Sequence, residues 1–270
     1  MGSLMIIGGA EDRTDNMEVL KKFIELSGGE DQPLVVLTAA STVPEKIWEM
    51  YQGAFNALHA HKVRHLPMAD RAAAEDEELA HAIATAKGIF ITGGDQKRLM
   101  TIIGGTRCGN ALRQAWRENG ACLAGTSAGA SGMCTHMMAE GHADLAPEKG
   151  AARLAAGLGF VPRVVIDQHF AQRHRINRLL SVVTQSPFLL GAGIDENTAL
   201  VVHQSDGLEV VGEGCVTVVD CRDARTNIVD IPAGEVPHIF GARLHLLPAG
   251  ACFRREGELT DFIDYLTKEH

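Results

Sequence analysis

Short apolar runs alternate with longer segments of helical periodicity through the first half of the chain. Most of these runs are apolar at consecutive positions, which is typical of parallel strands buried on both faces. In the segments between them, apolar residues recur every three or four positions, as on one face of an amphipathic helix. The predicted strands are Leu4–Ile7, Leu34–Thr38, Val63–Leu66, Gly88–Thr92 and Ala121–Ala124, and the predicted helices are Asn16–Leu26, Pro44–Leu58, Asp76–Ala86 and Leu112–Asn119. This alternation predicts an α/β fold with a mostly parallel central sheet flanked by helices.

The pattern changes after about Val201, where short β-like runs are separated by glycine, aspartate and proline. These runs predict an antiparallel β extension of the same domain, followed by a closing helix. The predicted strands are Leu208–Val211, Cys215–Cys221 and Ala242–Leu247, and the helix is Leu259–Thr267. A stretch rich in alanine, glycine and glutamate, Ala139–Gly159, predicts a mobile loop. Since no linker or internal repeat is evident, we expect residues 1–270 to form a single domain.

Composition and charge narrow the class of protein. The 270 residues carry a formal net charge of −9 with no block of lysine and arginine, so neither nucleic acid nor an anionic membrane is an expected partner. No apolar run of about 18 residues predicts a membrane span, and Met1–Gly9 lacks the features of a secretory signal. The six cysteines form no C-x-x-C pair, which favours reduced thiols and a cytoplasmic location over disulfides or zinc.

The pentapeptide Gly-Thr-Ser-Ala-Gly at 125–129 directly follows the apolar run Ala121–Ala124. Strand, Gly-x-Ser-x-Gly and a small-residue helix start are the parts of a nucleophile elbow, which would expose the Ser127 hydroxyl on a sharp turn. The N–H of Ala128 would then help to stabilise an oxyanion. The pentapeptide by itself is equally typical of an ordinary glycine-rich turn.

A nucleophilic serine needs a base, and the base needs an orienting acid. The best candidate base is His169, which ends the β-branched run that begins at Val164. Glu196 is the favoured acid because it ends another apolar segment, and Asp195 is the alternative. Site residues of parallel sheets belong at such strand ends, although a histidine there is more often structural. The order Ser, His, Glu differs from that of ordinary α/β-hydrolases, which indicates a different fold.

Three arginines follow the proposed base at Arg173, Arg175 and Arg178, on a predicted helix start that places Arg175 and Arg178 on one face. Guanidinium groups bind carboxylates bidentately, so the cluster favours an acidic substrate. The alternative is a solvated basic face, or pairing with the many acids of the chain.

Another strand end carries two glycines followed by polar residues. Gly93 or Gly94 would offer a second N–H to an oxyanion, and Asp95 and Gln96 would make polar contacts to a substrate. A separate group of histidines lies at a helix end and indicates a solvated surface and not a metal site, since it has no carboxylate at ligand spacing. It consists of His59, His61 and His65.

Taken together, these residues resemble the cyanophycinase family, serine peptidases related to aspartyl dipeptidase. The matching motifs run in family order and span nearly the whole chain. They are Gly-Gly-Ala-Glu-Asp at 8–12, Thr-Gly-Gly-Asp-Gln at 92–96, Gly-Thr-Ser-Ala-Gly-Ala at 125–130, Asp-Gln-His-Phe at 167–170 with the three arginines, and Gly-Ile-Asp-Glu at 193–196. The resemblance implies a fold similar to the flavodoxin-like class I glutamine amidotransferases, a Ser127–His169–Glu196 triad, a homodimer, and neither cofactor nor metal.

The resemblance also implies a substrate. Cyanophycinases release β-Asp-Arg dipeptides from cyanophycin, a poly-aspartate with arginine on each side chain. The arginine cluster would recognise free carboxylates, and Gln96, Asp167 and Gln168 would accept hydrogen bonds from the guanidinium of the substrate. Two alternatives stay open: an aspartyl or isoaspartyl dipeptidase acting on short Asp-x peptides, and a catalytically silent binding protein on the same scaffold. An amidotransferase is disfavoured because position 127 is not cysteine.

Overall fold

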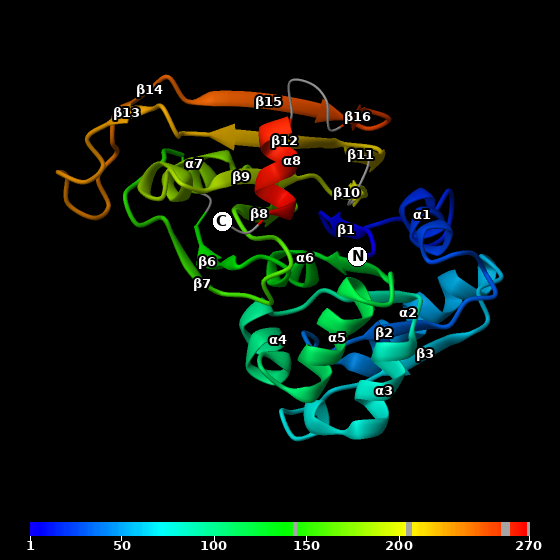
Figure 1. Cartoon of the computed structure of the whole chain (residues 1–270). Coiled ribbons are helices and arrows are strands. Elements are labelled where there is room, and N and C mark those ends of the chain that lie inside the picture. The colour runs from blue at the N-terminus through cyan, green and yellow to red at the C-terminus, as the bar shows by residue number, and fades with distance from the viewer. Residues whose placement is uncertain (143–144, 204–206, 255–259, 269–270) are drawn as a thin grey trace.

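The five strands predicted in the first half of the chain form the parallel part of an eight-stranded sheet in the computed structural model (Figure 1). The structure describes residues 1–142, 145–203, 207–254 and 260–268. The parallel strands are β1 (Leu4–Ile7), β2 (Leu34–Leu37), β3 (Val63–Leu66), β4 (Gly88–Ile91) and β5 (Cys122–Thr126). Three antiparallel strands, β10 (Thr198–His203), β11 (Gly207–Gly212) and β16 (Cys252–Arg254), continue the sheet beyond β1, in the order β16-β11-β10-β1-β5-β4-β2-β3.

A second sheet of four strands has the order β15-β12-β9-β8 and lies level with β16, β11 and β10 of the first sheet in Figure 1. It contains β8 (Val164–Gln168), β9 (Leu190–Ile194), β12 (Cys215–Asp220) and β15 (Arg243–Pro248). Only β8 and β9 run parallel to each other. Helix α6 (Ala128–Gly132) packs against β5 of the first sheet and β8 of the second. The predicted antiparallel extension is therefore divided between the two sheets.

Helices cover both faces of the parallel strands, which explains why those strands are apolar without interruption. Along β1, Met5 and Ile7 pack into one core, and Leu4 and Ile6 pack into another. The first core includes α1 (Glu18–Leu26) and α2 (Pro44–Ala57). The second includes α3 (Glu77–Thr85), α4 (Gln96–Ile103), α5 (Arg107–Arg117) and α8 (Thr260–Thr267). Helix α7 (Ile176–Gln185) packs against β9 and β12, and η1 (Ala73–Glu75) precedes α3.

The α/β prediction is confirmed, and one local prediction is wrong. Both ends of the predicted loop Ala139–Gly159 contribute to paired strands, β6 (His136–Gly141) and β7 (Ala152–Ala156). Met137 and Met138 bury their side chains and anchor β6, whereas the alanines and glycines that follow carry no visible hydrophobic alternation. Two short strands, β13 (Arg225–Thr226) and β14 (Ile239–Phe240), complete the structure. That the chain forms a single domain stays a prediction.

Candidate active site

Ser127 lies at the sharp turn between β5 and α6. Its backbone has a positive φ of 52° with a ψ of −111°, a conformation that a non-glycine residue keeps only when its surroundings enforce it. The Ser127 N–H donates to Ile7 O over 3.0 Å, which ties the turn to the end of β1. A Cβ on Gly129 would lie 2.3 Å from Ile91 O, so only glycine allows α6 to approach β4 this closely.

A chain of hydrogen bonds joins Ser127 to His169 and Glu196. The Ser127 Oγ lies 2.9 Å from His169 Nε2, and His169 Nδ1 lies 2.6 Å from Glu196 Oε1. A carboxylate accepts, so Nδ1 carries the proton and Nε2 is free to accept from the serine hydroxyl. His169 follows β8 and Glu196 follows β9, and these parallel neighbours bring their carboxyl ends together.

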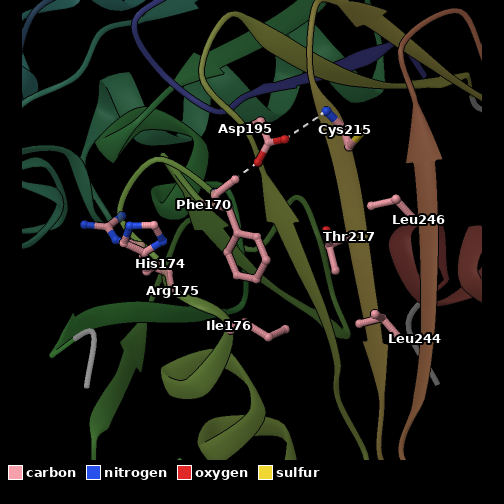
Figure 2. A pocket seen from close by; sticks show the side chains of 10 residues that line it. Phe170, His174, Arg175, Ile176, Asp195, Cys215, Thr217, Leu244 and Leu246 are labelled. Atoms are coloured by element: carbon pink, nitrogen blue, oxygen red, sulfur yellow. Dashed lines mark hydrogen bonds between the residues drawn. The ribbon is translucent and has the colours of Figure 1, made fainter. Parts of the chain in front are cut away.

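Asp195 faces away from His169. Its carboxylate accepts from the backbone N–H groups of Ala171 and Cys215, each over 3.0 Å (Figure 2). It thereby lines a separate, mainly apolar groove of about 410 Å³, into which Phe170 also points. Phe170 packs over Gly193, where any Cβ would meet its ring at 2.3 Å. Asp195 therefore links the loop after His169 to β12.

Burial is the main influence on His169. It lowers the pKa of the imidazole below its usual 6.5, and the positive charges of Arg173 and Arg175 lower it further. The hydrogen bond to Glu196 acts in the opposite direction. The ring is therefore neutral near pH 7 and able to take a proton.

The loop after β1 contacts the segments of all three residues. Gly9 has φ +100°, and a Cβ there would lie 2.4 Å from His169 Cε1, so glycine leaves room for the ring. The His169 N–H donates to Gly8 O over 2.7 Å, and the Asn197 N–H donates to Gly9 O over 2.9 Å. The Gly-Gly pair at 8–9, which belongs to the motif at 8–12, is the sequence signal for this close approach.

Glu11, from the same loop, is buried beneath the Ser127 turn. The Thr126 hydroxyl donates to Glu11 Oε2 over 2.6 Å, the Tyr51 hydroxyl donates to Glu11 Oε1, and Arg13 Nη1 lies 3.6 Å from that oxygen. Burial raises the pKa of Tyr51 well above its usual value, so the phenol keeps its proton and remains a donor. The motif at 8–12 contains Glu11, but the sequence did not indicate its partners, because they lie far away along the chain.

A polar cavity of about 480 Å³ opens beside Ser127. Its wall is formed by strand ends, by β6 and by the arginine cluster. The lining residues are Gly94, Gln96, Ser127, Met138, Glu140, Gly141, Gln168, Arg173, Arg175 and Arg178.

The three predicted arginines all reach this cavity but differ in their partners. Arg178 Nε donates to Asp167 Oδ2 over 2.7 Å and its Nη2 donates to Oδ1. Arg175 Nη1 donates to both oxygens of Gln168 and lies 3.4 Å from Asp167 Oδ1. Burial lowers the pKa of Arg175 to about 10, so it stays charged. Asp167 is buried behind these arginines, which does not fit its expected contact with a substrate guanidinium.

Arg173 is exposed, in contrast to its two neighbours. Within the described ranges, no carboxylate pairs with its guanidinium. Arg173 thus offers a free cation to a ligand in the cavity.

Asp95 and Gln96 organise the opposite wall. Asp95 caps α4 by accepting from the N–H groups of Lys97 and Arg98. Gln96 Nε2 donates to Met138 O over 3.1 Å and to Ala139 O over 2.8 Å, which fastens β6 to the end of β4. Both side chains therefore hold the shape of the site.

The predicted oxyanion donors lie around Ser127. A Cβ on Gly93 would come within 3.3 Å of Ser127 Cβ, and one on Gly94 would lie 2.2 Å from Ala40 O. Ala128 is the first residue of α6, where a helix leaves its N–H groups without an internal acceptor.

The histidine group lies away from this cavity. His65 Nε2 lies 2.9 Å from Thr38 Oγ1 and its ring stacks on Trp48, while the His59 and His61 rings meet edge to face with their centroids 6.2 Å apart. In the part of the chain that the structure describes, no three His, Cys, Asp or Glu side chains are grouped as metal ligands would be.

All six cysteines are free thiols. No helix within the described ranges combines the length and apolar character that a membrane crossing requires.

Comparison with known proteins identifies the class. Residues 4–210 match the model of Peptidase family S51, and the chain belongs to this family. It is 38% identical over 253 residues to the cyanophycinase of Synechococcus elongatus, covering 93% of this chain and 79% of that protein. It is 36% identical over 255 residues to the cyanophycinase of Geminocystis herdmanii, covering 94% of each.

A solved structure supports the fold. A peptidase from an acI-B1 actinobacterium superimposes with a TM-score of 0.69 at 23% identity, covering 94% of this chain and 97% of that one. A putative peptidase E from Listeria monocytogenes has a TM-score of 0.54 at 16% identity over 78% of this chain.

Proposed function

We propose that this protein is a serine peptidase that hydrolyses cyanophycin and releases β-Asp-Arg dipeptides, with Ser127, His169 and Glu196 as its catalytic triad. The observation that carries the proposal is the hydrogen-bonded chain from Ser127 through His169 to Glu196, in which Ser127 lines a cavity together with three arginines. The cyanophycinases at 36–38% identity support the choice of substrate.

In the proposed mechanism, His169 Nε2 accepts the hydroxyl proton as Ser127 Oγ attacks the aspartyl backbone carbonyl. The oxyanion of the tetrahedral intermediate accepts hydrogen bonds from the N–H of Ala128 and from Gly93 or Gly94. Glu196 stabilises the imidazolium, which then donates its proton to the leaving amine. Water, deprotonated by His169, hydrolyses the acyl-enzyme and frees Ser127.

The arginine cluster would bind the carboxylates of the substrate. Each arginine attached to cyanophycin exposes a carboxylate, and guanidinium groups match that anion geometrically. Arg175 and Arg178 are already held in place by Gln168 and Asp167, so little side-chain freedom is lost on binding. Arg173, which has no carboxylate partner within the described ranges, is free to pair with the anion directly.

The test incubates purified protein with insoluble cyanophycin and follows clearing and product mass. Ser127→Ala should lose about 10⁶-fold in turnover, as serine peptidases do without their nucleophile. The matched control is Ser131→Ala, which removes a buried hydroxyl one helical turn further along α6. Clearing by Ser127→Ala at the wild-type rate would overturn the proposal. Product size over time separates dipeptide release at chain ends from internal cleavage.

A second assay separates the alternatives. A fluorophosphonate probe should label wild-type protein and not Ser127→Ala, whereas a silent binding protein would not be labelled. Cleavage of short Asp-x peptides without clearing of the polymer would instead identify a dipeptidase.

We also propose that the protein is a homodimer. Strand β15 is the edge of the second sheet, and Leu244 and Leu246 on it are 61% and 62% exposed. Exposed apolar edge strands readily pair with another chain. Light scattering should give twice the mass of one chain, and Leu246→Glu should lower the measured mass towards that of a single chain. A wild-type monomer would contradict the proposal.

A cytoplasmic location stays a prediction.

A further inference from the structure

Glu140 is the single carboxylate among the described residues that line the cavity beside Ser127, and the three arginines line the same cavity. We propose that Glu140 is the specificity-determining residue for the basic side chain of the substrate and pairs with its guanidinium. This inference rests on the proposed function, since it assigns a second charge recognition to the same site.

The backbone around Glu140 is anchored on both sides. Before it, Gln96 Nε2 donates to the carbonyls of Met138 and Ala139. After it, Arg178 Nη1 donates to Gly141 O over 2.9 Å. The register of β6 against β7 also shifts between Met138 and Glu140, and such bulges re-aim side chains next to active sites. Glu140 is therefore held at the cavity by the residues that shape the site.

The other acceptors near the cavity are already occupied. Asp167 accepts from Arg178 with both oxygens, and Gln168 Oε1 accepts from Arg175. Asp95 accepts from the first turn of α4. Among the described residues, Glu140 is therefore the carboxylate that can bind a guanidinium entering the cavity.

The present partners of Glu140 are easily exchanged. Lys97 Nζ lies 3.2 Å from Glu140 Oε2, and Arg153 Nη1 lies 3.4 Å from Oε1. The side chains of Lys97 and Arg153 are 55% and 80% exposed, and ion pairs this exposed contribute little to stability. Lys97 and Arg153 each contact one carboxylate oxygen, whereas a substrate guanidinium that binds both oxygens at once would compete well against these single contacts.

The cavity thus has two recognition elements of opposite charge. Arg173 and its neighbours suit a carboxylate, and Glu140 suits a cation on the same ligand. An arginine whose α-amino group is in an amide bond carries both groups, joined by a flexible stem. Recognition of both the α-carboxylate and the guanidinium of one arginine would explain its selection over uncharged residues of the same size.

The experiment compares kcat/KM for a β-Asp-Arg trimer and for the corresponding citrulline trimer, which keeps the shape of arginine without its charge. Wild-type protein should prefer the arginine trimer by about tenfold. Glu140→Gln should remove this preference by lowering only the arginine value. The matched control is Glu78→Gln, whose exposed carboxylate pairs with Arg64 outside the cavity. It should leave both values unchanged.

Three results would overturn the inference. The first is a Glu140→Gln variant that keeps the wild-type preference. The second is an equal fall with both trimers, which would show that Glu140 supports the hairpin without contacting the guanidinium. The third is a wild-type enzyme that cleaves both trimers equally well. If the wild type cleaves neither trimer nor clears cyanophycin, the proposed function itself fails.

Discussion

The hydroxyl of Thr126 donates to Glu11 over 2.6 Å, which ties the residue before Ser127 to the loop after β1. In the same loop, the carbonyl oxygen of Gly8 accepts from the His169 N–H, and that of Gly9 accepts from the Asn197 N–H. Asn197 Oδ1 in turn accepts from the Asp12 N–H over 2.8 Å. One short loop therefore sets the relative positions of the three strand ends that carry the proposed triad.

Thr126→Val tests this link. The variant leaves the buried Glu11 with one donor fewer and should lose about 1.5–3 kcal/mol of unfolding free energy. Because the strained Ser127 turn follows directly, kcat should fall while KM changes little. Thr38→Val is the matched control, since it removes a buried hydroxyl at the end of β2 that contacts His65 instead. Equal losses of kcat in both variants, measured on the trimer, would refute a specific positioning role.

Gly9→Ala should impair catalysis through His169. The new Cβ would lie 2.4 Å from His169 Cε1, so the imidazole must move away from Ser127. A displacement of about 1 Å at such a site costs about 10²-fold in kcat. Gly29→Ala is the control, because Gly29 has a similar φ of +106° but a Cβ added there would meet no atom within 4 Å. Comparing kcat with thermal melting separates displacement of His169 from backbone strain; a normal kcat in Gly9→Ala would contradict the prediction.

Asp167→Ala should destabilise the protein strongly. It leaves Arg175 and Arg178 buried without their counter-ion, which costs about 3–5 kcal/mol in comparable pairs. Asp223→Ala breaks an exposed pair with Arg243 and should cost less than about 1 kcal/mol. Urea unfolding monitored by circular dichroism measures both values, and similar losses in the two variants would argue against a buried ion-pair network.

Activity should fall on the acid side as His169 becomes protonated. Because burial lowers the pKa of His169, the midpoint of this fall in kcat/KM should lie below 6.5. The positive charge of Arg173 also disfavours the imidazolium, so Arg173→Gln should move the midpoint to higher pH. Arg107→Gln, an exposed arginine that pairs with Glu77, should leave it unchanged. A midpoint above 6.5 in the wild type, or no movement in Arg173→Gln, would count against His169 as the base.

Local patterns were sufficient for much of the fold. The parallel strands were predictable because both of their faces are buried, so they read as uninterrupted apolar runs. Helix α4 was missed, whereas the helix start predicted at the arginines corresponds to α7. The hairpin of β6 and β7 was also missed, because its alanine and glycine residues show little alternation between apolar and polar positions.

The sequence by itself determined which residue types stand at the ends of buried strands, including Ser127 on its glycine-flanked turn and His169 after β8. Such positions follow from short-range sterics and hydrophobic burial, which neighbouring residues impose on one another. Only the tertiary structure decided that Glu196 faces His169 while Asp195 caps another backbone segment, and that Asp167 neutralises buried arginines. Asp195 and Glu196 lie just beyond the end of β9, where the backbone has left the sheet, so their partners depend on which distant segments pack against this turn.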